Sequence, residues 1–282
     1  MPDNESRQAD SEKGKALAIA VPDRGRDDLR RAVRIITQNP LTLLGVAIFL
    51  AVILASICAP LLTPYNPVEQ DLANPLLAPS GQHLTGTDEM GRDLFTRILY
   101  GGRISLQAAA LVIIMAGGIG TILGCIAGYY GRVVDELIMR TSDLFLAFPG
   151  LVLAIAIATA LGPSLENALI AISLVWWPWY ARLLRGQVLS MKQSQYVEAA
   201  LSLGASDGRV LFRHILPNCV GPLTVQVTLD AGAAILSTAS LSFIGVGAQP
   251  PTPEWGALIA VGREYMLSQW WYPTFPGFAI LL

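Results

Sequence analysis

Long apolar stretches are the feature that most constrains what this chain can fold into. A membrane-spanning helix needs about 20 mostly apolar residues. Only 14% of the residues are charged, against about a quarter in a typical soluble domain. The sequence therefore predicts an all-α integral membrane protein, a polytopic helical bundle. The apolar segments expected to span the membrane are Leu41–Leu62, Ser105–Tyr129, Asp143–Leu161, Asn167–Leu184 and Val220–Val246.

A sixth apolar segment begins near Tyr272 and continues to the last residue, Leu282. It is too short to cross a bilayer alone. We therefore expect about six transmembrane helices, the sixth being truncated where the sequence stops. A half-span packed against a partner is the alternative for this segment.

The distribution of basic residues predicts the orientation of the chain. With the N-terminus in the cytoplasm, 15 of the 19 Lys and Arg residues lie inside and 4 lie outside. Such an excess of positive charge inside is typical of membrane proteins. The arginines just before the first span favour an anchor that orients the chain among the membrane lipids over a site that binds anionic lipid or nucleic acid. These arginines are Arg24, Arg26, Arg30, Arg31 and Arg34.

This orientation divides the chain into four parts. Residues 1–40 form a cytoplasmic, partly disordered tail, and residues 41–62 form the first transmembrane helix. Residues 63–104 form a periplasmic or extracellular segment. Residues 105–282 form the transmembrane core, with a cytoplasmic loop at 187–218.

Catalytic signatures are missing from the sequence. It contains no GxxxxGK[ST] loop for phosphates, no HExxH and no GxSxG. Cys58, Cys125 and Cys219 show no metal-type spacing, and His83 and His214 are far apart. We expect no catalytic residue, bound cofactor or metal site in this chain.

Asp230 is the one charged residue well inside a predicted span. A charge in the middle of the bilayer is costly and usually functional. A pore-lining or gating role and an interhelical hydrogen bond both remain open for it. An ion-coupled secondary transporter, the alternative from another class, would need more such groups. Asp143 lies near the cytoplasmic end of its segment, where it could cap a helix together with Ser142.

Gly120, Gly124 and Gly128 follow one another at intervals of four residues in the second span. This spacing places three glycines on one helix face, where another backbone can approach closely. Packing within the chain and packing against another subunit are equally compatible with it.

The fourth span ends in VWWPWYARLLRG. We interpret its aromatic residues as a belt at the inner membrane interface, with a substrate cage as the alternative. The residues are Trp176, Trp177, Trp179 and Tyr180.

Two outward-facing segments precede the second and the last span. In the first, Thr87 or Asp88 could cap a short helix that Gly101–Gly102 would break. The second covers 248–271. Both could receive an external partner, or lie on the bilayer surface as lids.

The cytoplasmic stretch YVEAALSLGASDGRVLFRHILPN predicts two short helices. The first covers Tyr196–Leu203 and ends at Gly204. Ser206 or Asp207 caps the second, and Pro217 stops it before the next span. A short helix with alanines and one acidic residue suits insertion into a groove of another protein.

The same stretch resembles the EAA loop of ABC-importer permeases. The family's pattern is EAA, three residues, Gly, nine residues and I-x-LP. Glu198-Ala199-Ala200, Gly204 and Leu216-Pro217 follow its spacing, with His214 in place of the isoleucine. GTDEMGRDLFTRILYGGRISL (86–106) and LSFIGVGAQPPTPEWG (241–256) resemble segments of the dipeptide/oligopeptide/nickel permease group.

The resemblance implies a permease like those of type I ABC importers, multi-pass in the bacterial inner membrane. Its implied partners are a second homologous permease, two ABC ATPase subunits that use ATP and Mg, and a periplasmic or lipid-anchored solute-binding protein. Di- or oligopeptides are the implied cargo, with nickel or another non-peptide solute as the alternative. The residues that it implies for docking to the ATPase are Tyr196, Glu198, Ala199, Ala200, Gly204, Asp207, Leu216 and Pro217.

Overall fold

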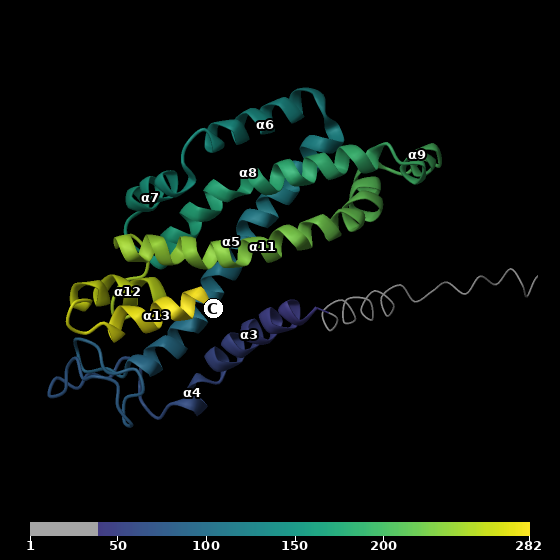
Figure 1. The fold of residues 1–282 in the computed structure, drawn as a ribbon. Coiled ribbons are helices and arrows are strands. Elements are labelled where there is room, and N and C mark those ends of the chain that lie inside the picture. The colour runs from purple at the N-terminus through teal and green to yellow at the C-terminus, as the bar shows by residue number, and fades with distance from the viewer. Residues whose placement is uncertain (1–38) are drawn as a thin grey trace, which may run out of the picture. The chain divides into compact units, whose positions relative to one another are not determined.

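The computed structural model describes residues 39–282, which are dominated by helices (Figure 1). The tail expected at 1–40 lies outside the described residues except for its last two positions. Contacts divide the chain into two units, Met1–Ala51 and Val52–Leu282. The first helix, α3, covers Pro40–Ile57, and a single turn, α4, covers Ala59–Leu62.

Helix α5 covers Leu94–Tyr130 and is 37 residues long. Asp93 caps its start by accepting a hydrogen bond from the Thr96 amide at 2.8 Å, so the expected caps Thr87 and Asp88 are wrong. The expected break at Gly101–Gly102 is also wrong, because the helix continues through both glycines. At 1.5 Å per residue α5 is about 55 Å long, so part of it extends beyond a hydrocarbon core of about 30 Å.

Close packing explains the two glycines inside α5. A Cβ atom on Gly101 would lie 2.0 Å from the Pro253 carbonyl oxygen, and one on Gly102 would lie 2.1 Å from the Ser56 hydroxyl. Glycine is therefore needed there for contact, and the helix accepts its lower propensity.

The span expected at Asp143–Leu161 is two helices. Helix α6 covers Arg132–Leu146, α7 covers Gly150–Leu161, and the pair is bent by 90°. Asp143 lies in the last turn of α6, where it pairs with Arg182, so its predicted role as a helix cap is wrong.

Helix α8 covers Leu165–Lys192 and continues through Pro178. Ser164 caps it by accepting a hydrogen bond from the Asn167 amide at 3.1 Å. The aromatic-belt interpretation is wrong for Trp177 and Tyr180, because both are buried. Trp177 packs edge-on against Phe145 of α6, with ring centroids 5.7 Å apart.

The cytoplasmic stretch forms α9, Gln195–Ser202, then a turn, α10, at Asp207–Arg209, and a π-helix at Val210–Ile215. Helix α11 follows without interruption and covers Leu216–Ile244. Pro217 therefore does not separate a second helix from the span, as expected from the sequence. It lies in the first turn of α11, directly after the π-helix, and the helical run continues through it.

Helix α12, at Trp255–Gly262, and a 3-10 turn at Arg263–Tyr265 lead to α13, at Trp271–Leu281. Within residues 39–282, three helices are long and apolar enough to cross a membrane, or four if the bent α6–α7 pair is one span. The three are α3, α5 and the run Asp207–Ile244.

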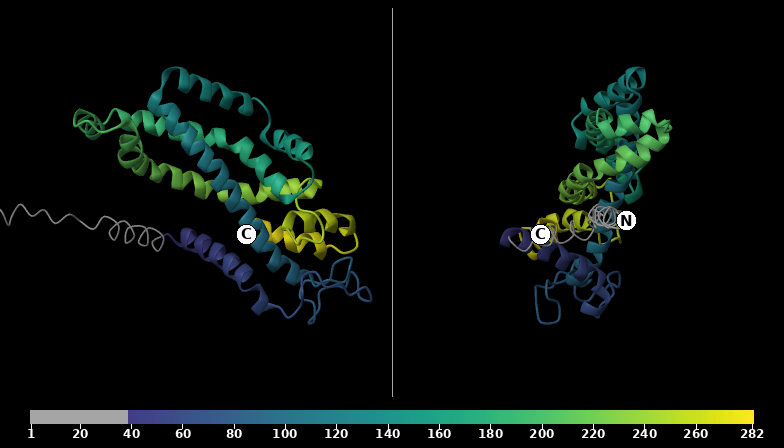
Figure 2. Two further views of the ribbon diagram at one scale, coloured as in Figure 1. Left: turned by 180° about the vertical axis from the view of Figure 1, so that it is seen from behind. Right: turned by 90° about the vertical axis from the view of Figure 1, so that its right-hand side faces the viewer.

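Helices α5 and α8 pack in parallel at the centre of the second unit (Figures 1 and 2). A Cβ atom on Gly120 would lie 2.5 Å from the Trp177 carbonyl oxygen, and one on Gly124 would lie 2.4 Å from that of Ala181. A Cβ atom on Gly128 would lie 2.9 Å from the Arg185 carbonyl oxygen. The structure thus places this close approach inside the chain.

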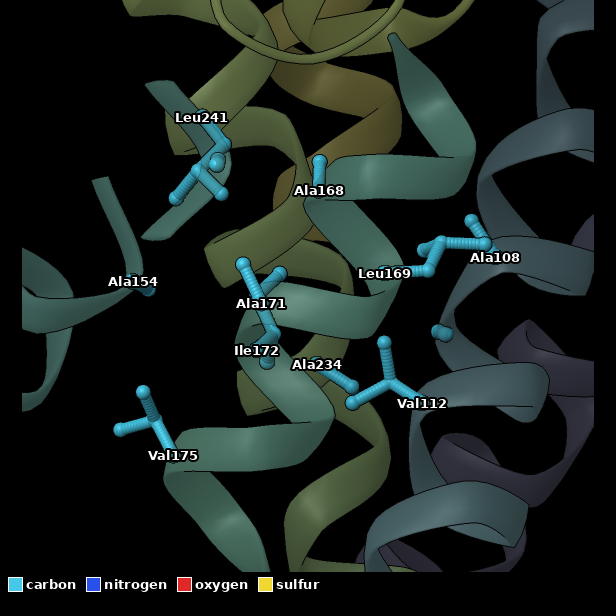
Figure 3. Close-up of a cluster of buried hydrophobic side chains, with 12 residues drawn as sticks. Ala108, Val112, Ala154, Ala168, Leu169, Ala171, Ile172, Val175, Ala234 and Leu241 are labelled. Atoms are coloured by element: carbon cyan, nitrogen blue, oxygen red, sulfur yellow. The ribbon is translucent and has the colours of Figure 1, made fainter. Parts of the chain in front are cut away.

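Alanines fill much of the apolar core beyond this contact (Figure 3). Four helices contribute to it, α5, α7, α8 and α11. Small side chains let the backbones of these helices lie close together. The labelled members are Ala108, Val112, Ala154, Ala168, Leu169, Ala171, Ile172, Val175, Ala234 and Leu241.

We predict that Gly124→Ala destabilises the protein by about 1–3 kcal/mol, because its methyl group overpacks the contact with Ala181. The thermal denaturation midpoint of the detergent-purified protein measures this. Gly118→Ala is the matched control, since no atom lies within 4 Å of the added Cβ. Equal midpoints for the two variants would contradict the prediction.

Candidate functional site

The cytoplasmic loop is anchored in the helical core by buried apolar side chains. Val197 of α9 is fully buried, as are Val210 and Ile215 of the π-helix. They form one cluster with the inner ends of α5 and α8. A displacement of α9 is therefore transmitted to these helices by direct packing. The cluster consists of Cys125, Tyr129, Leu184, Val188, Val197, Val210, Leu211, Ile215 and Cys219.

Gly204 ends α9 in the left-handed conformation, with a φ of +81°. The Ala205 amide donates to the Ala200 carbonyl at 3.1 Å, and the Gly204 amide donates to that of Leu201 at 2.9 Å. These two hydrogen bonds form a Schellman motif, which fixes the exit of the chain from the helix. The direction of the following segment thus depends on Gly204.

Polar contacts attach the rest of the loop to the end of α5. The Tyr129 hydroxyl donates to Asp207 at 2.8 Å, and the Lys192 ammonium donates to the Tyr129 carbonyl at 2.6 Å. Ser206 occupies the N-cap position of α10, but its side chain makes no capping hydrogen bond. The side chain of Asp207 thus has a hydrogen-bond partner within the chain, the Tyr129 hydroxyl.

The outer face of the loop combines one acidic side chain with exposed apolar ones. Glu198 and Ala199 are exposed, Ala200 is half-buried, and Tyr196 is 42% exposed. Leu203 is 88% exposed. An exposed apolar patch with a polar rim marks a surface for a protein partner.

Other residues of the motif lie at the edges of this face. Leu216 is half-buried and Pro217 is exposed. Phe212 is 67% exposed, and the sequence interpretation missed both it and Leu203. Both are large apolar side chains in a stretch that the sequence predicts to be cytoplasmic.

Asp230 lies in a second place of interest, a half-open cavity of about 290 Å³ between α8 and α11. The Gln226 amide nitrogen donates to its Oδ1 atom at 2.9 Å. The other lining residues are Trp176, Trp179, Tyr180 and Ala233.

The outer segment that resembles the permease group forms a buried charge cluster. Asp88 is fully buried and accepts a hydrogen bond from Arg92 Nε at 2.6 Å, while Arg97 lies 3.2 Å from it. Arg92 also pairs with Glu89 at 2.8 Å, and Glu89 accepts a hydrogen bond from the Tyr272 hydroxyl. Asp88, Arg92 and Arg97 are buried, so these side chains point into the protein.

The second outer segment joins the same region to α5. Glu254 is fully buried and caps α12 through the Ala257 amide at 2.9 Å. Its other oxygen accepts from the Ser105 hydroxyl at 3.0 Å, and the Trp255 indole donates to the Ile98 carbonyl at 2.9 Å. Both segments thus hold the outer end of the helices together.

No group of three or more His, Cys, Asp or Glu side chains within residues 39–282 could hold a metal ion.

We predict that Asp88→Asn destabilises the protein by about 3–5 kcal/mol, because it removes the carboxylate that pairs with buried Arg97 and one of the two that pair with buried Arg92. Thermal denaturation in detergent measures the loss. Glu136→Gln is the control, since its pair with Arg140 is exposed and contributes at most about 1 kcal/mol. A midpoint for Asp88→Asn as high as that of the control would contradict the structural role of the cluster.

Residues 120–282 match the family model described as "Binding-protein-dependent transport system inner membrane component". Residues 29–79 match the model "N-terminal TM domain of oligopeptide transport permease C". The two matches follow each other along the chain.

Named relatives cover most of the chain. The dipeptide transport system permease protein DppC of Alkalihalophilus pseudofirmus is 48% identical over 253 residues, 90% of this chain and 83% of that protein. The probable D,D-dipeptide transport system permease protein DdpC of Escherichia coli K12 is 49% identical over 252 residues, 89% of this chain and 85% of that protein.

A solved structure has a similar fold. A chain of the MetNI methionine ABC transporter, in an inward-facing conformation, aligns with a TM-score of 0.51 and 14% identity. The alignment covers 67% of this chain and 88% of that chain.

Proposed function

The chain belongs to the family of binding-protein-dependent transport system inner membrane components, and we propose that this permease subunit passes di- or oligopeptides delivered by an external binding protein. The observation that carries the peptide assignment is the similarity to two dipeptide permeases over most of the chain. The implied complex contains a second homologous permease, two ABC ATPase subunits and a periplasmic or lipid-anchored binding protein.

In this proposal the energy comes from the partner subunits. ATP and Mg are bound and used by the ATPases, and this chain contributes no catalytic group. Its own task is to offer a path across the membrane and to change that path when the ATPases close. Such coupling requires the ATPases to bind the two states of the permease with different free energy.

The exposed face of α9 is the part of the chain best suited to receive the ATPase. Glu198 offers one charge, and Tyr196 and Leu203 offer apolar contact area. Ala199 and Ala200 leave room for a groove wall to approach, as in other helix-in-groove contacts. Leu216 and Pro217 lie at the edge of this face and continue into α11.

The support for a coupling role is the rigid attachment of this face. Val197 lies on the inner side of the same helix and packs in the cluster with α5 and α8. Gly204 fixes the exit of α9, and Asp207 holds the next segment to Tyr129. We therefore assign Gly204 and Asp207 to shaping the docking surface more than to contact with the ATPase.

We expect labelled dialanine to be taken up by proteoliposomes that contain the complete importer, its loaded binding protein and ATP. Inactivation of the ATPase subunits should reduce uptake to background. Collapse of proton and sodium gradients should leave it unchanged. Uptake that survives ATPase inactivation but follows an ion gradient would instead support a secondary transporter. Competition by nickel ions but not by peptides would contradict the peptide assignment.

We predict that Glu198→Lys abolishes ATP-dependent uptake while the protein still reaches the membrane, because it reverses the charge on the docking face. Gly204→Pro should act likewise, since proline cannot adopt a φ of +81°. Glu166→Lys is the control. It makes the same change of charge in the first turn of α8, at the end of that helix away from α9. Co-purification of the ATPase and uptake are the measurements. Normal uptake by both loop variants would refute the coupling role.

A further inference from the structure

Asp230 is the central residue of the 29-residue helix α11. It is only half-buried, and within residues 39–282 none of the ion pairs includes it. A carboxylate at this depth does not face lipid, because hydrocarbon cannot solvate it. The face of α8 and α11 that carries Asp230 therefore borders water or another subunit.

The cavity around Asp230 has a polar floor and an aromatic wall. Tyr180 is fully buried and lines the cavity together with Asp230, and its hydroxyl has no hydrogen-bond partner among residues 39–282. Gln226 donates to Oδ1. Oδ2 and the Tyr180 hydroxyl are thus available to a ligand, and buried polar atoms are costly to leave without partners.

Two tryptophans complete the cavity. Trp176 is half-buried, and Trp179 is 59% exposed at the opening. The faces of aromatic rings attract cations, most strongly when a carboxylate is also present and water is scarce. The combination of Asp230 with two indoles and a phenol therefore favours a cation and repels an anion.

The size of the cavity restricts the ligand further. Its volume of about 290 Å³ lies just below the range of pockets that enclose a drug-sized molecule, about 300–1,000 Å³. It suits one end of a peptide and not a whole oligopeptide. A primary ammonium group has three donors, which Oδ2, the Tyr180 oxygen and an indole face can share.

We propose that this cavity binds the α-ammonium group of a peptide as it passes through the permease. The inference rests on the proposed peptide transport and adds a contact point halfway across the membrane. Binding there is weak, because a transported molecule must leave the site as readily as it enters.

Transport by the complete importer tests the role of the carboxylate. We expect Asp230→Asn to reduce dialanine uptake at least tenfold, with ATP hydrolysis in the presence of loaded binding protein within twofold of the unmodified importer. Asp230→Glu should restore at least a third of the uptake. Retained ATP hydrolysis distinguishes a lost contact from a misfolded subunit. Uptake by Asp230→Asn within twofold of the unmodified importer would overturn the proposal.

Thr228→Val is the matched control on the same helix, outside the cavity, and should leave uptake within twofold. Tyr180→Phe removes only the hydroxyl and should reduce uptake several-fold, with ATP hydrolysis again retained. If Tyr180→Phe and Asp230→Asn both transport normally, the cavity has no part in transport. Failure of the unmodified importer to take up dialanine with ATP would instead refute the proposed function.

Direct binding tests the ammonium group itself. Dialanine and N-acetyl-dialanine are titrated into the purified importer without its binding protein, and tryptophan fluorescence is recorded. We expect dialanine to change the fluorescence at a concentration at least fivefold lower than N-acetyl-dialanine, and Asp230→Asn to abolish the difference. An equal response to the two peptides, or none to either, would contradict the site.

Discussion

The contact between the backbones of α5 and α8 is the constraint on which the second unit depends. Glycine at 120, 124 and 128 removes every side chain from this face of α5 over three successive turns. Other parts of the unit are attached at the ends of these two helices. The outer end of α5 carries the charge cluster, and the inner ends of both carry the cytoplasmic loop. The bent pair α6–α7 packs against α8. Asp135 of α6 forms an ion pair with Arg185 of α8.

The sequence was informative wherever the structure of a segment depends on the residues of that segment alone. Hydrophobic length located the spans, and three glycines at intervals of four residues indicated a close approach. Prediction from the sequence failed where contacts with residues far away in the chain determine the local structure. Gly101–Gly102 would end an isolated helix, but Pro253 and Ser56 pack against it and favour glycine without a break. The break between α6 and α7 has a local signal, because Pro149-Gly150 lie at it, but the apolar length of the segment was taken to indicate one span.

The candidate sites show the same division. Glu198 and Gly204 were identified from a local motif, because helix, glycine and proline lie within a few turns. Asp230 was noticed for its charge in an apolar segment, yet its surroundings could not be predicted. Trp176 and Tyr180 come from another helix about 50 residues earlier, where they resembled interfacial residues. Only the pairing of α8 with α11 turns these separate signals into one cavity.

The hydrogen bond from Tyr272 to Glu89 has a consequence for biosynthesis. The two residues are 183 positions apart. At about 5–20 residues per second, the ribosome adds Tyr272 roughly 10–40 s after Glu89. Until then the carboxylates and arginines of the outer segment lack a neighbour that shields them. The outer end of the protein can therefore be completed only after Tyr272 has been synthesised, whereas the α5–α8 contact can form earlier during translation.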